Sequence, residues 1–386
     1  MVDAPPTPAG KPSSNSSLRQ TLLIALAVVI LGALAWRASG AIQLEGFSWQ
    51  RLGEVIRGTN LWLLAVALAA IYAAYAIRAW RWMRLSRYVG RSSFWNVYPA
   101  TLIGFAVVFL LGRAGEPVRP ILIARKDRIP VSSAFGVYVM ERIFDVASTA
   151  VIAGFALLVF PETPGGTESS ALLAAARTTG VLLLVGLIAA ISFLVYFRLH
   201  GASALERRMA RWRQQHGWRA KVAGLFSGFV EGLHGIRTLG DLMAAIGSSS
   251  AHWILVAYIY LWVFHAFGGR LGELDFVAAM LVLAFTMVGS TLQLPGVGGG
   301  SQVASFLALT VVFGVEKEAA AASSIVLWLI TFAGSCLAGV PLLVKEGWSM
   351  AELRRLASAE AEAEAAGTHV RLPESAPVAT HKESAK

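Results

Sequence analysis

Several stretches of this chain are long enough and apolar enough to cross a lipid bilayer. A transmembrane helix needs about 20 apolar residues, and runs near that length lie at 21–37, 61–80, 132–160, 171–197, 242–268 and 318–344. Of the 386 residues, 56% are hydrophobic and only 15% are charged, whereas soluble domains carry about 25% charged residues. The sequence therefore predicts an all-α polytopic membrane protein with about six full transmembrane helices.

Two further apolar regions are interrupted and predict a different element. Region 96–125 is divided by GRAGEPVRP (112–120), and region 277–313 is divided by LPGVGGGSQ (294–302). We expect 96–125 to form a re-entrant hairpin, because its two limbs are short for full crossings. For 277–313, a hairpin and two full spans remain alternatives. Two broken segments of opposite approach would suit a transporter with an inverted repeat, although the halves show no convincing sequence repeat.

Charged residues between the apolar runs indicate how the chain is oriented. Segments 78–91 and 198–221 are rich in arginine, whereas 161–170 carries two glutamates and no lysine or arginine. Basic loops favour the cytoplasmic side, so both termini are expected there. The net charge of +10 arises largely from such segments, so nucleic acid is not an expected partner. We expect a transmembrane domain over 20–347, with disordered cytoplasmic tails at 1–19 and 348–386.

The stretch 112–120 places two arginines, Arg113 and Arg119, where a helix should be crossing lipid. An arginine at the centre of a lipid-facing helix costs about 2.5–3.5 kcal/mol, so both should face protein, water or a headgroup. Pro117 suits the first turn of a helix and biases Glu116 away from helical geometry. We expect a turn over 112–116, a helix from Pro117, and a phosphate site at its start. A charged loop at the membrane surface is the alternative.

A second polar group lies within the apolar run at 132–160. Glu141 and Asp145 are four residues apart and share a helix face, and Arg142 precedes Asp145 by three. Ionisable groups at that depth indicate a functional site with buried partners. We expect Arg113 or Arg119 to pair with Glu141 or Asp145. A buried network with a purely structural role is the alternative.

The interruption in the second region is rich in glycine. Gly298, Gly299 and Gly300 allow the backbone to turn or to approach a ligand closely, and we expect Ser301 to cap the following helix. No lysine follows the glycines as it does in a nucleotide-binding loop. Tight packing between helices is the alternative role.

Neither a metal nor another cofactor is expected. The single cysteine, Cys336, excludes an internal disulfide and a cysteine metal cluster. His252 and His265 lie in an apolar run without the spacing of a metal site, so we expect them to have structural roles.

Four segments together resemble the lysylphosphatidylglycerol synthase transmembrane family, also called the flippase-like domain family. They are RAWRWMRL, GRAGEPVRPILIARK, VYVMERIFDV and LPGVGGGSQVASFLALTVVFGV, and the resemblance covers about 60–345. Members are similar to the N-terminal half of the bacterial multiple peptide resistance factor, which is assigned to lipid translocation. The resemblance implies a multi-pass protein of the bacterial inner membrane. The aminoacyl-transferase domain of the full synthase is not expected, because only a short tail follows Trp348.

The resemblance also implies which residues contribute to the translocation path. In many members the glycine motif ends in a glutamate, and here that position is Gln302. The substrate-binding candidates are Arg113, Gly115, Glu116, Arg119, Glu141, Arg142, Asp145, Gly298, Gly299, Gly300 and Gln302.

The expected function is that of a lipid flippase or lipid-binding transporter for an anionic or phosphate-linked lipid, including an aminoacylated one. The alternatives are an integral-membrane transferase acting on a lipid-linked substrate and an assembly subunit for a separate soluble transferase. The expected partner is a phospholipid or a polyprenyl-phosphate-linked lipid. The sequence leaves the oligomeric state open, and a homodimer is the default because twofold dimers are the commonest homo-oligomers.

Overall fold

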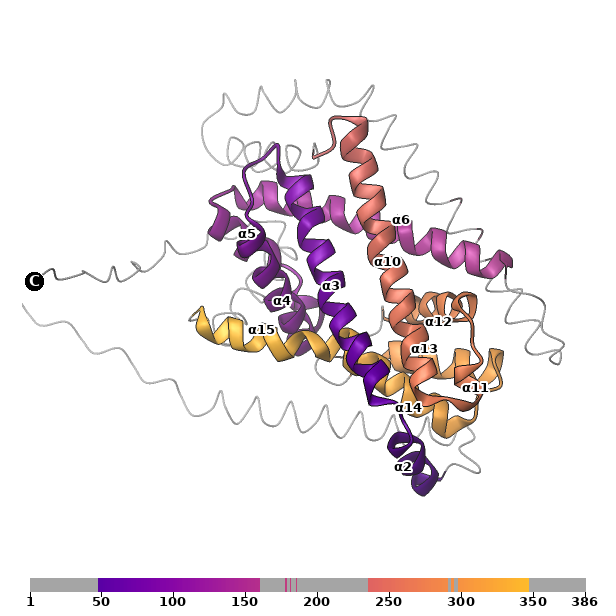
Figure 1. Cartoon of the computed structure of the whole chain (residues 1–386). Helices are drawn as coiled ribbons and strands as arrows, with labels where there is room; N and C mark the ends of the chain where they lie inside the picture. The colour runs from indigo at the N-terminus through magenta and orange to yellow at the C-terminus, as the bar shows by residue number, and fades with distance from the viewer. Residues whose placement is uncertain are drawn as a thin grey trace, which may run out of the picture. The chain divides into compact units, whose positions relative to one another are not determined.

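The structure is a computed structural model that describes residues 48–159, 178, 181, 185, 235–290, 293–294 and 298–346. The expected spans at 21–37 and 171–197, the basic segment 198–221 and both tails lie outside the described residues. Within the described part, five helical segments are long and apolar enough to cross a membrane (Figure 1). They are α3 (Leu61–Ser86), α4 (Phe94–Leu111), α6 (Val131–Val159), α10 (Leu239–Phe267) and the continuous segment Lys317–Lys345. The all-α polytopic membrane class is therefore confirmed.

Helices α3 and α10 pack side by side in antiparallel directions (Figure 1). At one end, the Asn60 backbone N–H donates to the carbonyl oxygen of Ala266 at 2.8 Å. At the other end, the Tyr88 hydroxyl donates to Asp241 at 2.8 Å. We call this second end, where α3 finishes, the basic end. Its arginines among the described residues are Arg84, Arg87, Arg91, Arg125, Arg128 and Arg237.

The region after α3 forms the expected hairpin. Helix α4 leads through the 3-10 turn η1 (Gly112–Gly115) into α5 (Val118–Asp127). The Asn96 side-chain amide donates to Asp127 Oδ1 at 2.7 Å, so the chain returns to the basic end. The ten residues of α5 extend about 15 Å, half of the hydrocarbon thickness. Region 96–125 therefore forms a helical hairpin with one long and one short limb, and its turn lies at η1 as expected.

The region after α10 forms a second hairpin. A short helix α11 (Gly269–Gly272) precedes α12 (Phe276–Gly289), which is followed by β1 (Gln293–Leu294), β2 (Gly298–Gly299), α13 (Gly300–Leu307) and the π-helical turn η3 (Ala308–Val312). Arg270 Nη1 donates to the carbonyl oxygen of Gly314 at 3.0 Å and so joins the two ends of this segment. Both limbs are shorter than a full span. These lengths favour a hairpin over two full spans.

The two hairpins approach each other from opposite ends of the α3–α10 pair. The first follows the C-terminal end of α3, and the second follows the C-terminal end of α10, which runs the other way. Their tips meet, because β1 contacts η1. This is the arrangement expected of two broken segments with opposite approach.

The last described segment runs from the second hairpin back to the basic end. It consists of α14 (Lys317–Trp328), the π-helical turn η4 (Leu329–Ala333) and α15 (Gly334–Lys345). Helix α15 packs on α4 so closely that a Cβ added to Gly339 would lie 2.4 Å from the carbonyl oxygen of Leu102. An ion pair between Lys126 and Glu346 fixes α5 to the chain just beyond α15. The amphipathic helix α2 (Trp49–Arg57) precedes α3.

Candidate functional site

Three helices bring ionisable side chains together inside the membrane domain. Helix α6 presents Glu141 and Asp145 on one face, because residues four apart lie one above the other on a helix. Helix α3 contributes Arg78 and Arg81, and α5 contributes Arg119. All five side chains are buried, with Arg81 and Glu141 fully enclosed.

Glu141 is contacted by three guanidinium groups. Its Oε2 accepts from Arg119 Nη1 at 2.8 Å, and its Oε1 lies 2.9 Å from Arg81 Nη2 and 3.3 Å from Arg78 Nη1. The predicted pairing of an arginine from the first interruption with a carboxylate of α6 is therefore found between Arg119 and Glu141. This pair joins the first hairpin to α6.

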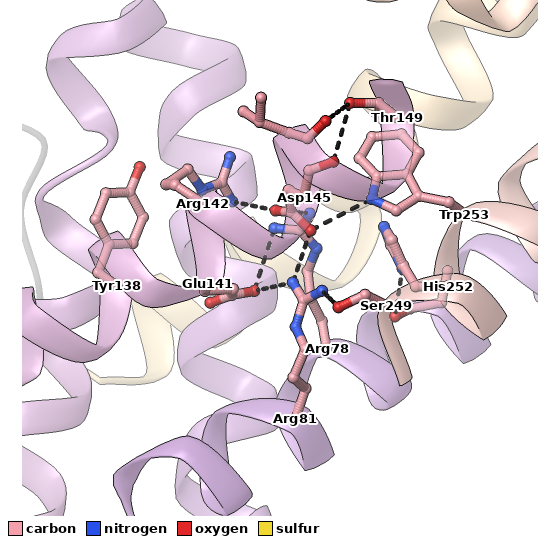
Figure 2. A network of polar contacts seen from close by, with 12 residues as sticks. Arg78, Arg81, Tyr138, Glu141, Arg142, Asp145, Thr149, Ser249, His252 and Trp253 are labelled. Atoms are coloured by element: carbon pink, nitrogen blue, oxygen red, sulfur yellow. Dashed lines mark hydrogen bonds and ion pairs between the residues drawn. The ribbon is translucent and has the colours of Figure 1, made fainter. Parts of the chain in front are cut away.

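Asp145 is the second anionic centre, shown in Figure 2. Its Oδ2 lies 2.6 Å from Arg78 Nη2 and 3.3 Å from Arg142 Nη2. Its Oδ1 lies 2.8 Å from Arg81 Nη2 and accepts from the Trp253 indole at 3.4 Å. Each carboxylate oxygen of Glu141 and Asp145 is therefore engaged by at least one donor. We call Arg78, Arg81, Arg119, Glu141, Arg142 and Asp145 the arginine–carboxylate network.

Neighbouring side chains fix the positions of the guanidinium groups. Arg81 Nη1 donates to Ser249 Oγ of α10 at 2.6 Å. The guanidinium carbon of Arg78 lies 5.2 Å from the centre of the Phe105 ring, and that of Arg119 lies 5.0 Å from the Trp82 ring. Such cation–π contacts strengthen when water is excluded.

The arginine–carboxylate network carries more positive than negative charge. Four guanidinium groups face two carboxylates, which leaves an excess of two positive charges. Within the described part of the chain, Arg78 Nε, Arg81 Nε, Arg119 Nη2 and Arg142 Nε have no hydrogen-bond partner. The Arg142 side chain is 38% exposed, whereas the other three arginine side chains are 1–4% exposed. Arg142 is therefore the cation that a ligand can reach first.

The sequence interpretation of Arg78 and Arg81 was wrong. Both were assigned to a cytoplasmic loop on the assumption that the span ended at residue 80, but α3 continues to Ser86. Trp82, on the same stretch, is fully buried as well. The buried face of α3 continues at helical spacing through these residues, and this periodicity is the signal that could have identified them.

The remaining residues of the first hairpin have different surroundings. Glu116 Oε2 accepts from the Tyr138 hydroxyl at 2.6 Å, and the Arg142 guanidinium carbon lies 5.2 Å from the centre of the Tyr138 ring. Glu116 is thus linked to the arginine–carboxylate network through Tyr138. Arg113 belongs to η1, but its side chain lies outside the described residues.

Gly115 is required by close packing. A Cβ added to it would lie 2.8 Å from the backbone of Val107 in α4. Real Cβ atoms are essentially never found that close, so only glycine lets the turn fold against this helix.

The glycine motif occupies the second hairpin. Gly299 has a φ of 134° and is the N-cap of α13, and its N–H donates to the Gln302 side chain. The prediction that Ser301 caps the helix was therefore wrong. Gly298 pairs with Leu294 between the two short strands, and Gly300 packs tightly against Gly289. Gln302 consequently has a local capping role at this site.

The histidines show no metal-binding arrangement in the part of the chain that is described, where no group of three or more histidine, cysteine or acidic residues could hold a metal ion. His252 Nδ1 lies 3.2 Å from the carbonyl oxygen of Ala74 and its ring packs edge-on against Trp253.

Comparison with known proteins agrees with these features. A family model described as the lysylphosphatidylglycerol synthase TM region matches residues 22–339, a range that includes both hairpins and the whole arginine–carboxylate network. Comparisons with curated proteins and with solved structures found no match. The chain therefore belongs to the lysylphosphatidylglycerol synthase transmembrane family.

Proposed function

We propose that this protein is a lipid flippase or lipid-binding transporter that moves an anionic or phosphate-linked lipid across the bacterial inner membrane. The observation that carries this proposal is that four guanidinium groups, three of them buried, face only two carboxylates in the network. Membership of a family of membrane regions linked to lipid synthesis supports a lipid as the ligand.

The excess charge calls for an anion on energetic grounds. An arginine at the bilayer centre costs about 2.5–3.5 kcal/mol even on the insertion scales that give the lowest values, and here four arginines share two carboxylates. A lipid phosphate would supply the missing charge and accept hydrogen bonds from N–H groups such as Arg119 Nη2 and Arg142 Nε, which lack a partner in the described part. Guanidinium groups suit this task because their N–H groups match the oxygens of a phosphate.

The geometry suggests where the phosphate enters. Arg142 is the most exposed arginine of the network, and it lies next to Tyr138, which holds Glu116 at the tip of the first hairpin. A phosphate that displaces Glu116 from Tyr138, or joins it there, would contact Arg142 before reaching the buried arginines. The first hairpin then acts as the movable wall of the site.

A transporter accounts for the carboxylates better than a transferase does. An acid–base catalyst needs a carboxyl oxygen free to reach the reacting group. In this network every oxygen of Glu141 and Asp145 is engaged by a donor. Glu141 and Asp145 therefore hold the arginines in place, and we propose no catalytic role for them.

The distribution of arginines gives the orientation of the protein in the membrane. The basic end holds six arginines among the described residues, so it faces the cytoplasm by the preference of basic segments for that side. The first hairpin then enters from the cytoplasm and the second from the outside.

The test is leaflet exchange in liposomes that contain the purified protein and a fluorescent anionic phospholipid. The wild type should exchange the lipid, and Arg119→Gln and Arg142→Gln should slow the exchange at least tenfold, as expected for the loss of about 1.4 kcal/mol. Arg91→Gln, which removes an exposed arginine at the basic end, is the matched control and should exchange normally. Absence of exchange by a folded wild type would overturn the proposal.

A further inference from the structure

One terminal amino group of the buried arginines is left without a contact. Both terminal nitrogens of Arg78, both of Arg81 and Nη1 of Arg119 lie within 3.3 Å of a carboxylate or hydroxyl oxygen. Arg119 Nη2 is buried as well, but it has no hydrogen-bond partner within the described part of the chain. A buried donor without an acceptor is unfavourable, and a phosphate oxygen would supply the acceptor that this nitrogen lacks.

A threonine of α4 decides which nitrogen of Arg119 is left over. Thr101 is fully buried, and its hydroxyl donates to the carbonyl oxygen of Val97 at 2.8 Å. A hydroxyl has one proton and two lone pairs, so toward any further group Thr101 can only accept. It accepts from Arg119 Nε at 3.2 Å. The threonine therefore holds the Nε edge of this guanidinium group.

The planar guanidinium group is then fixed on three sides. Its Nε is held by Thr101, its Nη1 lies 2.8 Å from Glu141 Oε2, and its carbon lies 5.0 Å from the centre of the Trp82 ring. Because the five N–H groups form a rigid fork, two held nitrogens determine the direction of the third. Thr101 and Glu141 together therefore set the direction in which Arg119 Nη2 points.

Without the threonine hydroxyl, Arg119 has a competing arrangement. Arginine–carboxylate pairs are frequently bidentate, yet Arg119 gives Glu141 only Nη1. Among the described residues, Glu141 Oε1 is shared by Arg78 and Arg81, whereas Oε2 is contacted by Arg119 alone. If Nε lost its acceptor, the guanidinium group would gain by turning a second N–H toward Glu141. The hydroxyl of Thr101 opposes that turn and so keeps Nη2 available.

A second position of α4 is shaped for the same arginine. A Cβ added to Gly104 would lie 2.6 Å from the Cβ of Arg119 and 3.2 Å from its Cγ. Real Cβ atoms are essentially never found as close as 2.6 Å, so any larger residue would push α5 away from α4. Thr101 and Gly104 are three residues apart and share one face of α4. This face therefore positions both the stem and the head of Arg119.

We infer that Thr101 is a positioning residue that keeps Arg119 Nη2 directed toward the phosphate of the transported lipid, with Gly104 providing the room for the arginine stem. This inference rests on the proposed function and adds the means by which a buried arginine, already paired with Glu141, retains an N–H for the ligand. Thr101 acts through Arg119 and does not itself contact the lipid.

The test measures, by native mass spectrometry of the full chain, the retention of phosphatidic acid and of diacylglycerol with the same acyl chains. Thr101→Val keeps the size of the side chain but removes the acceptor, and it should weaken the retention of phosphatidic acid about tenfold, the scale of one hydrogen bond to a charged group. Its retention of diacylglycerol should be unchanged. Thr101→Ser keeps the hydroxyl and should behave as the wild type does.

Two further variants separate positioning from a general effect on structure. In an Arg119→Gln background, Thr101→Val should cause no further loss, because the arginine through which it acts is gone. Thr310→Val in η3 is the matched control, since the Thr310 hydroxyl also donates to the carbonyl oxygen four residues earlier, at 2.9 Å; it should retain phosphatidic acid normally. If Thr101→Val does not fold, Thr101→Cys takes its place, because a thiol is a weak acceptor.

The outcomes distinguish this inference from the proposed function. If the wild type prefers phosphatidic acid but a folded Thr101→Val or Thr101→Cys shows the same preference, the inference is overturned and the proposed function stands. A further loss in the Arg119→Gln background, or equal losses in Thr101→Ser and Thr101→Val, would also overturn the inference. If the wild type retains both lipids equally, the proposed function fails and the inference fails with it.

Discussion

Replacing Glu141 by glutamine should destabilise the protein strongly. Glu141 is fully buried and contacts three arginines, at 2.8, 2.9 and 3.3 Å. The amide of Glu141→Gln can still accept hydrogen bonds, but it carries no charge. The excess positive charge of the arginine–carboxylate network therefore rises by one.

The structure allows the size of this effect to be worked out. Removing one partner of a buried ion pair costs about 3–5 kcal/mol, because the other charge stays buried without compensation. We expect that loss for Glu141→Gln. The variant Arg119→Gln removes one of the surplus cations, so combining both substitutions restores the original excess charge. The double variant should be more stable than the sum of the single effects predicts, by about 0.5–3 kcal/mol.

The assay is reversible unfolding in mixed detergent micelles, followed by circular dichroism. Glu316→Gln is the matched control, because Glu316 pairs with Arg51 at 3.4 Å while both side chains are about 60% exposed. An exposed pair of this kind contributes about 0–1 kcal/mol. If Glu141→Gln costs no more than Glu316→Gln, or if Glu141→Gln and Arg119→Gln have additive effects, the charge reasoning is refuted.

Two further predictions concern packing and topology. Gly115→Ala should lower the melting temperature, because the added Cβ would lie 2.8 Å from the backbone of α4. Gly247→Ala is the control: open space surrounds the added Cβ, so this variant should be neutral or stabilising by up to about 1 kcal/mol. A lower melting temperature for Gly247→Ala than for Gly115→Ala would contradict the hairpin packing. In a Cys336→Ser background, Arg128→Cys and Glu273→Cys should react with a membrane-impermeant thiol reagent from opposite sides of vesicles, because the two positions flank hairpins of opposite approach. Labelling of both from one side would refute that arrangement.

The hairpins could be predicted from sequence because length and charge both constrain them. Helix α5 has ten residues, too few to cross a bilayer, and basic residues flank both ends of the first hairpin. For the second hairpin these constraints were weaker, because a hairpin and two full spans both return the chain to the side from which it entered. The decision required the contact between Arg270 and Gly314, which no local pattern reveals.

The site could be predicted only in part. Glu141 and Asp145 were identified because charges in the middle of an apolar run are costly. Arg78 was misassigned because it lies near the end of an apolar run, where arginines usually contact headgroups, and its partner Asp145 follows 67 residues later. The buried hydroxyls of Ser301 and Ser324, which have no hydrogen-bond partner among the described residues, gave no signal in the sequence, because serine and threonine are common in membrane helices and often only bond their own backbone.

Direct lipid binding tests the central claim that the excess charge of the arginine–carboxylate network holds a phosphate. We would measure, by native mass spectrometry, the retention of phosphatidic acid and of diacylglycerol with the same acyl chains. The wild type should retain phosphatidic acid and release diacylglycerol, and Arg119→Gln and Arg142→Gln should weaken the retention while Arg91→Gln does not. Equal retention of the two lipids by the wild type, or unchanged retention of phosphatidic acid in Arg119→Gln and Arg142→Gln, would contradict the claim.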